Sequence, residues 1–329
     1  MRLSRRAIML ACAAACLPLP RGANAADKWP EKPVTFVNPF NAGGSADRIA
    51  RAIATYMTHE LGVPINVVNK PGAGGQLGAT YFLAQPDDGY TVFATSMSPY
   101  LANNILLTNA KFKMGDFGYI NSSWTDWDII AVHMDRPHKT LVELLNDIKA
   151  NPGKISASVV FGSSGQVVTL ALLDAAKIPP NNLKLVFYEG GAPARAAVAG
   201  GQVDFTVLGG EGSEGIRDFI RPLAVMLEQP DKDWPAPPVN EALKPLGIKM
   251  PVITGAMRGL VVHASFKQKH PDRYAKLVDA YKRTTDREDF KKFVAAGAMG
   301  NDWLGPEKTT QVVMENFEIL QKYKDLLKK

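Results

Sequence analysis

Short apolar runs alternate with helical patterns along most of the chain. In the first third, Val34–Val37 predicts a buried strand, and residues 47–60 predict a helix that carries Ile49, Ile53 and Met57 on one face. Apolar runs at 65–68 and 90–95 predict two further strands, separated by a glycine-rich turn at 72–78, a helix that ends near residue 84 and a turn at 87–89. This alternation of strand and helix predicts a parallel sheet with right-handed crossovers.

A second block of the chain repeats the same logic. Strands are predicted at 129–132, 155–161, 185–188, 203–208, 223–227 and 260–262, and helices at 140–150 and 166–177 and after 190–193. The proline-rich stretch 230–238 predicts a surface loop, and the remainder after residue 262 is mostly helical. Two α/β blocks in succession predict two domains.

The N-terminus has the pattern of a secretory signal. Arg2, Arg5 and Arg6 precede the apolar stretch 7–19, and the small residues of 23–25 match the pattern that a signal peptidase reads. We therefore predict a signal peptide at 1–25 and export of the mature chain to the periplasm. Residues 4–8 also resemble a twin-arginine signal, and a lipid anchor on Cys12 or Cys16 is a further, weaker alternative.

Composition narrows the classes of function. Of the 329 residues, 46% are hydrophobic, which is enough to build the cores of two domains. Both cysteines lie within the predicted signal, so the mature chain would have no disulfide, no thiol nucleophile and no cysteine-ligated zinc. The net charge is +6, and loss of the four arginines within 1–25 would reduce it to +2. This balance, without a basic tract, argues against nucleic acid as a partner.

Three turns rich in glycine and serine follow predicted strands, at 41–47, 72–76 and 162–166. Ligands bind at the carboxyl ends of strands in open α/β sheets, and a helix that starts there presents unpaired N–H groups and a partial positive charge. With the hydroxyl groups of Ser45, Ser163 and Ser164, these turns could hold an anion without arginine or lysine. The alternative is that Ser45 or Ser164 only caps a helix and that Asp47 is a favourable first-turn acid.

Motifs of enzymes and cofactor sites are incomplete. Leu77 stands where the third glycine of a dinucleotide fingerprint would follow Gly72, and Gln166 stands where a nucleophile elbow needs glycine. The five histidines form no metal-binding pair. We therefore expect a binding protein rather than an enzyme, with no catalytic residue, no metal and no cofactor.

Several motifs resemble those of one family of receptors. The stretch 39–47 with Arg51, the stretch 69–75 with Gly78 and the stretch 86–91 resemble, in that order, three signatures of the Bug (TctC-like) solute-binding proteins. Matching segments continue at 139–140, 151–154 and 221–225. These proteins are the periplasmic receptors of tripartite tricarboxylate transporters.

The resemblance implies an α/β type II periplasmic-binding-protein fold, with two lobes, a hinge crossed twice and a ligand cleft between the lobes. We expect lobe 1 at 26–128 plus 256–329 and lobe 2 at 129–255. The implied function is capture of a small organic carboxylate and delivery to a membrane permease by a monomeric receptor. The ligands of the family include di- and tricarboxylates, amino acids and aromatic acids.

Carried over residue by residue, the resemblance implies one set of ligand contacts on each lobe. On lobe 1 these are Phe40, Asn41, Gly44, Ser45, Asp47, Ala73 and Gly74; on lobe 2 they are Ser163, Ser164, Gln166 and Tyr188. Gln166 stands where many relatives have histidine, Glu189 is a further departure, and Trp124 and Trp127 are additions near the hinge. These tryptophans would either pack at the edge between the lobes or form an aromatic wall for a bulky ligand.

Two questions stay open at this point. Asp47 would either shape the glycine turn by accepting backbone hydrogen bonds or accept one from a hydroxyl or ammonium group of the ligand. The protein itself would be a transport receptor or a ligand sensor for a signalling partner. A periplasmic hydrolase or lyase is a further alternative, against which the absence of complete enzyme motifs argues.

Overall fold

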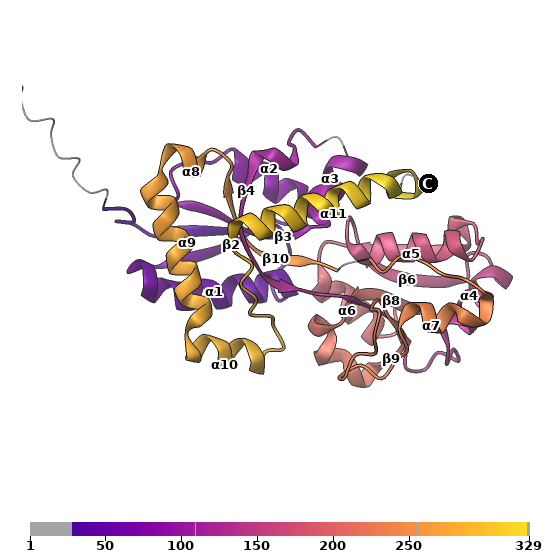
Figure 1. Ribbon diagram of the computed structural model, residues 1–329. Helices are drawn as coiled ribbons and strands as arrows, with labels where there is room; N and C mark the ends of the chain where they lie inside the picture. The colour runs from indigo at the N-terminus through magenta and orange to yellow at the C-terminus, as the bar shows by residue number, and fades with distance from the viewer. Residues whose placement is uncertain (1–27, 109, 254, 328–329) are drawn as a thin grey trace, which may run out of the picture.

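A computed structural model describes residues 28–108, 110–253 and 255–327 of the chain. Its strands form two five-stranded sheets, with the orders β2-β1-β3-β10-β4 and β7-β6-β8-β5-β9. Each sheet is flanked by helices and forms one lobe, and the two lobes lie end to end in Figure 1. The predicted signal peptide lies outside the described residues.

The first lobe is built on three parallel strands and two more that complete the sheet. The parallel strands are β1 (Val34–Asn38), β2 (Ile65–Asn69) and β3 (Thr91–Ser98), and β10 (Met257–His263) runs antiparallel between β3 and β4 (Phe117–Thr125). Alternation of side chains along β1 sends Phe36 to one face of the sheet and Val37 to the other. Each face therefore has its own apolar core.

Helices cover both faces of this sheet. On one face lie α1 (Ser45–Leu61), α8 (Phe266–Lys269), α9 (Pro271–Asp286) and α10 (Glu288–Ala296); on the other lie α2 (Gln76–Leu83), α3 (Tyr100–Leu107) and α11 (Gly305–Leu327). The short 3-10 helices Ala73–Gly75 and Met114–Asp116 complete the connections. The predicted helix at 47–60 is confirmed within α1.

The second lobe follows the same plan. Its strands are β5 (Asp128–His133), β6 (Ile155–Val160), β7 (Leu183–Tyr188), β8 (Phe205–Gly209) and β9 (Ile220–Val225). Its helices are α4 (Leu141–Ala150), α5 (Ser164–Ala175), α6 (Gly191–Ala199) and α7 (Val239–Leu243), with the 3-10 helices Pro180–Asn182, η4 (Glu211–Phe219) and Lys244–Leu246. Because β6 is parallel to both β7 and β8, the carboxyl ends of these strands meet at one edge of the sheet.

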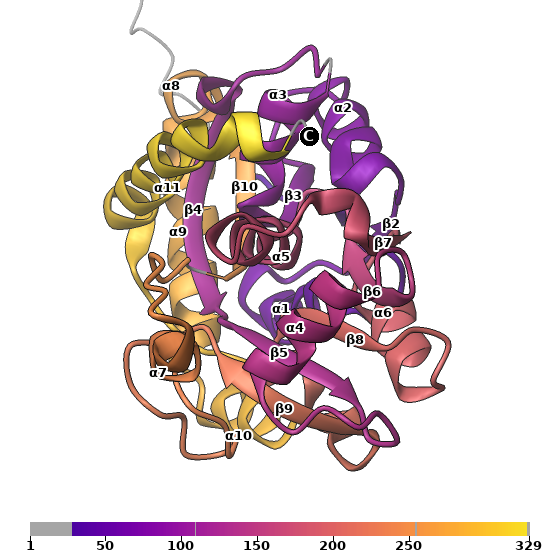
Figure 2. The same ribbon diagram turned by 90° about the vertical axis from the view of Figure 1, so that its right-hand side faces the viewer.

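The chain passes twice between the lobes. The first passage is the two-residue link from β4 to β5, and the second leads from the end of the second lobe into β10 at Met257. The lobe boundaries predicted near 128 and 256 fall beside these two passages. In addition, α11 packs against α3 and β4 of the first lobe and against α5 of the second, as Figure 2 shows from the end of the molecule.

One strand was not predicted from the apolar pattern. β4 contains Asn121, Ser122 and Ser123, all fully buried, which interrupt its hydrophobic run. Two of these buried polar side chains have hydrogen-bond partners in the interior. Asn121 donates to the Asp302 carbonyl oxygen at 3.0 Å, and the Ser123 and Tyr281 hydroxyl groups form a 2.5 Å hydrogen bond. These partners lie more than 150 residues further along the chain, so the local sequence pattern does not predict this strand.

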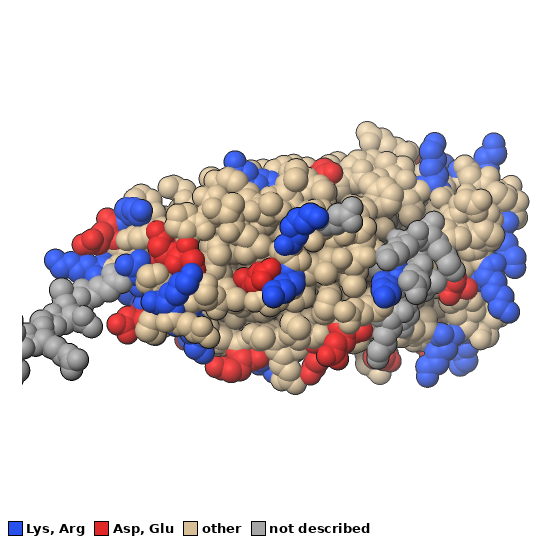
Figure 3. Space-filling view, turned by 90° about the horizontal axis from the view of Figure 1, so that it is seen from above, with Lys and Arg blue, Asp and Glu red and all other residues tan. Residues whose placement is uncertain are grey.

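Charged side chains on the surface are mostly mixed in sign. On the face in Figure 3, lysine and arginine alternate with aspartate and glutamate over the first lobe, and basic side chains prevail at the far end of the second lobe. No belt of one sign runs along the described residues of this face.

Candidate functional site

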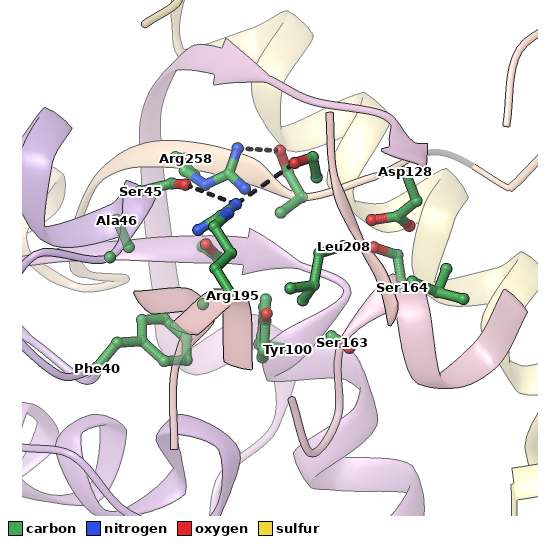
Figure 4. A pocket seen from close by; sticks show the side chains of 16 residues that line it. Phe40, Ser45, Ala46, Tyr100, Asp128, Ser163, Ser164, Arg195, Leu208 and Arg258 are labelled. Atoms are coloured by element: carbon green, nitrogen blue, oxygen red, sulfur yellow. Dashed lines mark hydrogen bonds between the residues drawn. The ribbon is translucent and has the colours of Figure 1, made fainter. Parts of the chain in front are cut away.

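A small cavity of about 40 Å³ lies between the lobes. Figure 4 shows it from close by. It is lined from the first lobe by Phe40, Gly44, Ser45, Ala46, Ser96, Tyr100, Ala256 and Arg258, and from the second by Asp128, Ser163, Ser164, Gly191, Arg195, Val207, Leu208 and Gly209. This volume has room for about one to three water molecules. The lobes therefore approach each other closely around this space, which must widen to admit a ligand larger than a few water molecules.

Three helices begin at this cavity. Glycines at 43 and 44 lead β1 into α1 at Ser45, and Gly43 has the positive φ of +82° that such a turn requires. Ser163 caps α5 by accepting a hydrogen bond from the Gln166 N–H at 3.2 Å, and α6 begins at Gly191. The first N–H groups of an α-helix have no partner within the helix. Together the three helix ends bring several backbone donors to one place.

Arg195 brings a buried positive charge to the cavity. It lies on α6 and is only 8% exposed. Its Nε donates to Ser213 Oγ at 3.0 Å, and its Nη2 donates to Ser45 Oγ at 3.3 Å, across the lobes, and to the Gly209 carbonyl oxygen at 3.4 Å. Burial lowers the pKa of Arg195 to about 10, so the guanidinium remains charged at neutral pH. None of these partners is an acid.

Arg258 is the second arginine of the cavity, and it is already neutralised. It lies on β10, and its Nη2 is 3.0 Å from Asp126 Oδ2, with both side chains buried. Its guanidinium also lies over the Trp124 ring, 4.5 Å from the ring centroid. Asp126 pairs directly with Arg258, whereas Arg195 has no carboxylate among its hydrogen-bond partners, although the negative charge of Asp126 also acts on it.

Asp128 faces the same space from the start of β5. Its carboxyl group is buried, and its Oδ2 has no hydrogen-bond partner among the described residues. Burial raises the pKa of Asp128 to about 7, against a hydrogen bond from Ser164, which lies beside it in Figure 4. The negative charge of Asp126 raises this pKa further, whereas Arg258 and Arg195 oppose the rise. At neutral pH the carboxyl group is therefore close to its titration midpoint.

Trp124 links the lobes rather than lining the cavity. It is fully buried, and its Nε1 donates to the carboxylate of Glu211 on η4 of the second lobe. Burial, together with the charge of Asp126, raises the pKa of Glu211 to about 7. Trp127 packs on Gly210 and does not line the cavity either. Of the two readings of these tryptophans, their positions favour packing at the edge between the lobes.

Five of the eleven predicted contact residues line the cavity, and six do not. The five are Phe40, Gly44, Ser45, Ser163 and Ser164. The six that the cavity lining does not include are Asn41, Asp47, Ala73, Gly74, Gln166 and Tyr188. Their roles as ligand contacts stay predictions, and the structure gives several of them other partners.

Asp47 is fully occupied inside the first lobe. Its Oδ2 accepts from the Gly43 N–H and from Arg51 Nε, both at 2.9 Å, and its Oδ1 accepts from Asn69 Nδ2 at 2.8 Å. Burial raises the pKa of Asp47, but these hydrogen bonds and the charge of Arg51 outweigh that effect and hold the pKa below its ordinary value. This geometry favours the reading in which Asp47 shapes the glycine turn.

Gln166 and Gly74 also make contacts within the protein. Gln166 Oε1 accepts from the Gly162 N–H at 2.8 Å and so stabilises the turn before α5. Gly74, in the first lobe, meets Phe161 of the second: a Cβ at this position would lie 2.5 Å from the Phe161 carbonyl oxygen. Gly74 therefore permits close approach of the lobes.

The charged residues of the cavity were missed by sequence reasoning. The glycine and serine turns appeared able to hold an anion without arginine, whereas Arg195 and Arg258 both line the cavity. Arg195 carried one local signal, since it is a single charge in the alanine-rich stretch 191–199 that follows a strand. Asp128 and Arg258 carried none, because each looks like an ordinary polar residue at the end of a strand.

The described residues also bear on metal binding and on membrane insertion. Within the described part of the chain, no group of three or more histidine, cysteine or acidic side chains is placed to hold a metal ion. In the same residues, no helix has the length and apolar character needed to cross a bilayer.

Comparison with known proteins identifies the family. Residues 49–329 match the model described as "Tripartite tricarboxylate transporter family receptor". The chain belongs to this family. The resemblance inferred from the motifs before residue 100 is therefore confirmed.

Two individual proteins are similar to this chain over most of its length. The chain is 30% identical over 320 residues to the "UPF0065 protein in gbd 5'region" of Cupriavidus necator, covering 95% of this chain and 93% of that protein. It is 28% identical over 228 residues to Protein BugT of Bordetella pertussis, covering 66% of this chain and 68% of that one.

A solved structure shares the fold. MatC from Rhodopseudomonas palustris with bound malate is 24% identical, with a TM-score of 0.78 over 91% of this chain and all of MatC. The predicted two-lobed periplasmic-binding-protein fold is confirmed.

Proposed function

We propose that this protein is a periplasmic receptor that captures a small organic carboxylate between its lobes and delivers it to the membrane subunits of a tripartite tricarboxylate-type transporter. The observation that carries the proposal is Arg195, a buried guanidinium at the cavity whose partners are two hydroxyl groups and a carbonyl oxygen. A buried charge without a directly paired counter-charge is costly, and a ligand carboxylate hydrogen-bonded to the guanidinium would reduce that cost.

The surroundings of Arg195 suit a carboxylate. A guanidinium can donate two parallel hydrogen bonds to one carboxylate, and the starts of α1, α5 and α6 supply N–H donors and the positive ends of helix dipoles. Ser45 of the first lobe and Arg195 of the second already touch across the cavity. A ligand that binds both lobes would stabilise the closed state relative to the open one.

Capture rather than catalysis is the activity that these groups support. The residues that line the cavity include no histidine or cysteine, and its single carboxyl group, on Asp128, has no second acid paired with it as in an acid–base dyad. We propose a monomeric receptor without metal or cofactor, exported by the signal at residues 1–25. Di- and tricarboxylates and aromatic acids are the first ligands to test.

Calorimetric titration of the mature protein against a panel of mono-, di- and tricarboxylates, aromatic acids and amino acids tests the capture step. We expect one ligand per chain and, for Arg195→Met, an affinity lower by about 10- to 150-fold, because a charged hydrogen bond contributes ~1.5–3 kcal/mol. Arg217→Met is the matched control, since Arg217 lies on the same lobe and is 40% exposed. Failure of the whole panel to bind, or equal affinity in Arg195→Met, would contradict the proposal.

Uptake of the labelled ligand by cells that lack the protein tests the delivery step. Loss of uptake, restored by the wild-type chain but not by Arg195→Met, is expected of a transport receptor. Unchanged uptake together with a lost transcriptional response to the ligand would instead favour a sensor that serves a signalling partner.

A further inference from the structure

We infer that the captured carboxylate also carries an ammonium group, so that the ligand is a zwitterionic amino acid held by its carboxylate at Arg195 and by its ammonium at Asp128. This inference rests on the proposed function and specifies the ligand of the same cavity. It assigns to Asp128 the selection of the ligand's substituent.

The cavity exposes one unmatched group of each sign. Arg195 has hydroxyl and carbonyl partners but no acid within hydrogen-bond distance. Asp128 is 2% exposed, and its Oδ2 is buried without a hydrogen-bond partner among the described residues. Both side chains line the same small space. A buried acceptor left without a donor is costly, so an occupant of the cavity that donates to Oδ2 gains free energy.

The other groups that face Asp128 do not fill this role. Arg258 is engaged by Asp126 at 3.0 Å, and Ser164 already contributes its hydrogen bond to the carboxyl group. Burial raises the pKa of Tyr100 far above neutrality, so this phenol stays uncharged. The remaining cation, Arg195, lies close enough to act on Asp128 through its charge, but no hydrogen bond joins the two. The hydrogen-bond donor to Asp128 Oδ2 would therefore come from the ligand.

An ammonium group fits Asp128 better than a hydroxyl group does. With Asp126 and Arg258 balanced, ionised Asp128 and Arg195 together carry no net charge, which matches a ligand with one charge of each sign. A plain carboxylate would satisfy Arg195 but bring a second negative charge towards Asp128. A hydroxyl group would also donate a hydrogen bond to the carboxylate but would leave its charge unbalanced, whereas an ammonium group both donates a hydrogen bond and carries the opposite charge.

Matched sets of acids that differ in one substituent test the inference. We would compare alanine, lactate and propionate; aspartate, malate and succinate; and phenylalanine, phenyllactate and phenylpropionate, each by calorimetric titration. In the set whose skeleton fits, the amino acid should bind at least about tenfold more tightly than the other two, as expected for a charge-assisted bond. Equal or tighter binding of the unsubstituted or hydroxy acid overturns the inference but leaves the proposed function intact. Binding of no member, nor of any carboxylate in the wider panel, overturns both.

Proton exchange on binding provides a second readout on the wild-type protein. Because burial raises the pKa of Asp128 to about 7, an ammonium group beside the buried carboxyl should lower that pKa and release up to about half a proton at pH 7. A plain or hydroxy acid adds negative charge and should cause proton uptake. Titrations in two buffers of different ionisation enthalpy measure the sign, and proton uptake with the best ligand would overturn the inference.

The variant Asp128→Asn tests whether Asp128 is the source of the proton release and of the preference for amino acids. It keeps the shape of the side chain and removes its charge, so affinity for the amino acid should fall at least about tenfold while affinity for its unsubstituted analogue is retained. The proton release should vanish. Asp135→Asn, at a position whose side chain is 89% exposed on the same lobe, is the matched control. A uniform loss across all three acids, with proton release unchanged, would remove Asp128 from the ligand's recognition.

Discussion

At the scale of single residues, the cavity separates charges that the protein balances itself from charges that it leaves open. Asp126 and Arg258 form a buried pair, and Asp47 is matched by Arg51 within the first lobe. Arg195 and Asp128, in contrast, have only neutral hydrogen-bonding neighbours. Since buried charges are costly unless paired, the unbalanced ones mark where a ligand belongs.

Asp47 gives a prediction that separates a structural acid from a recognising one. Asp47→Asn removes the charge that Arg51 and the Gly43 N–H bind, so we expect a loss of about 1–2 kcal/mol in the free energy of unfolding and an unchanged affinity for every acid. Thermal unfolding and calorimetry measure the two quantities. A loss of affinity specific to hydroxy or amino acids, at unchanged stability, would contradict the structural role.

The pH dependence of this effect has a definite sign. Hydrogen bonds hold the folded pKa of Asp47 below its ordinary value of 3.8, so its contribution to stability is complete above that pH and is lost as the pH falls through the folded pKa. The difference in stability between wild type and Asp47→Asn should therefore be constant near neutrality and shrink below about pH 4. A difference that grows on acidification would indicate another origin.

At the scale of elements, the site depends on where helices begin. The first turn of α5 packs against the backbone of β8, and this contact places Ser163 and Ser164 at the cavity. Gly165 makes the contact possible, because a Cβ there would lie 1.9 Å from the Val207 carbonyl oxygen. The glycine after the two serines therefore serves packing, while the serines face the ligand space.

Gly165→Ala tests this seating of α5. The helix must move off the strand to accommodate the methyl group, so we expect a destabilisation of about 2–4 kcal/mol and weaker ligand binding. Thermal unfolding and titration check both. Gly115→Ala, where an added Cβ meets nothing within 4 Å, is the control and should be close to neutral. If Gly165→Ala were equally neutral, α5 would not be held by this contact.

At the scale of the whole molecule, the lobes are held in contact by a few groups around the cavity. Asn103 of α3 donates to the Gly162 carbonyl oxygen of the second lobe at 2.7 Å, and Trp124 donates to Glu211. Arg195 reaches Ser45 across the cavity. Because the volume of the cavity is only about 40 Å³, we expect these contacts to open before an amino acid or a dicarboxylate enters. We therefore expect capture to proceed by opening and closure about the two segments that cross between the lobes.

Gly74→Ala is expected to oppose closure. The added methyl group would lie 2.5 Å from the Phe161 carbonyl oxygen of the other lobe. Solution scattering should then report a larger radius of gyration than for wild type, and ligand affinity should fall. Gly62→Ala is the matched control, because Gly62 has a similar positive φ, +74° against +61°, but no atom within 4 Å of the added Cβ. An unchanged radius and affinity in Gly74→Ala would show that this contact does not limit closure.

Apart from β4, the strands and the turns at the cavity were predicted from the sequence alone. Apolar runs such as Val34–Val37, the helical face of Ile49 and Ile53, and the turn at Gly43 are local features, since each depends on residues within a few positions. The signatures before residue 100, together with the later matching segments, indicated the family that the match over residues 49–329 shows. Ser45, Ser163 and Ser164 were likewise found because each lies where a strand passes into a helix.

The electrostatic character of the cavity was decided only by the tertiary structure. Arg195 meets Ser45 across 150 positions of the chain, and Arg258 meets Asp126 across 132. Whether a charge is balanced depends on such distant partners, and the pKa of Asp128 depends on burial, which no local pattern specifies. For the same reason Asp47, which looked like a ligand contact in sequence, has Asn69 and Arg51 as partners, whereas Asp128 lines the cavity with one carboxyl oxygen that has no hydrogen-bond partner among the described residues.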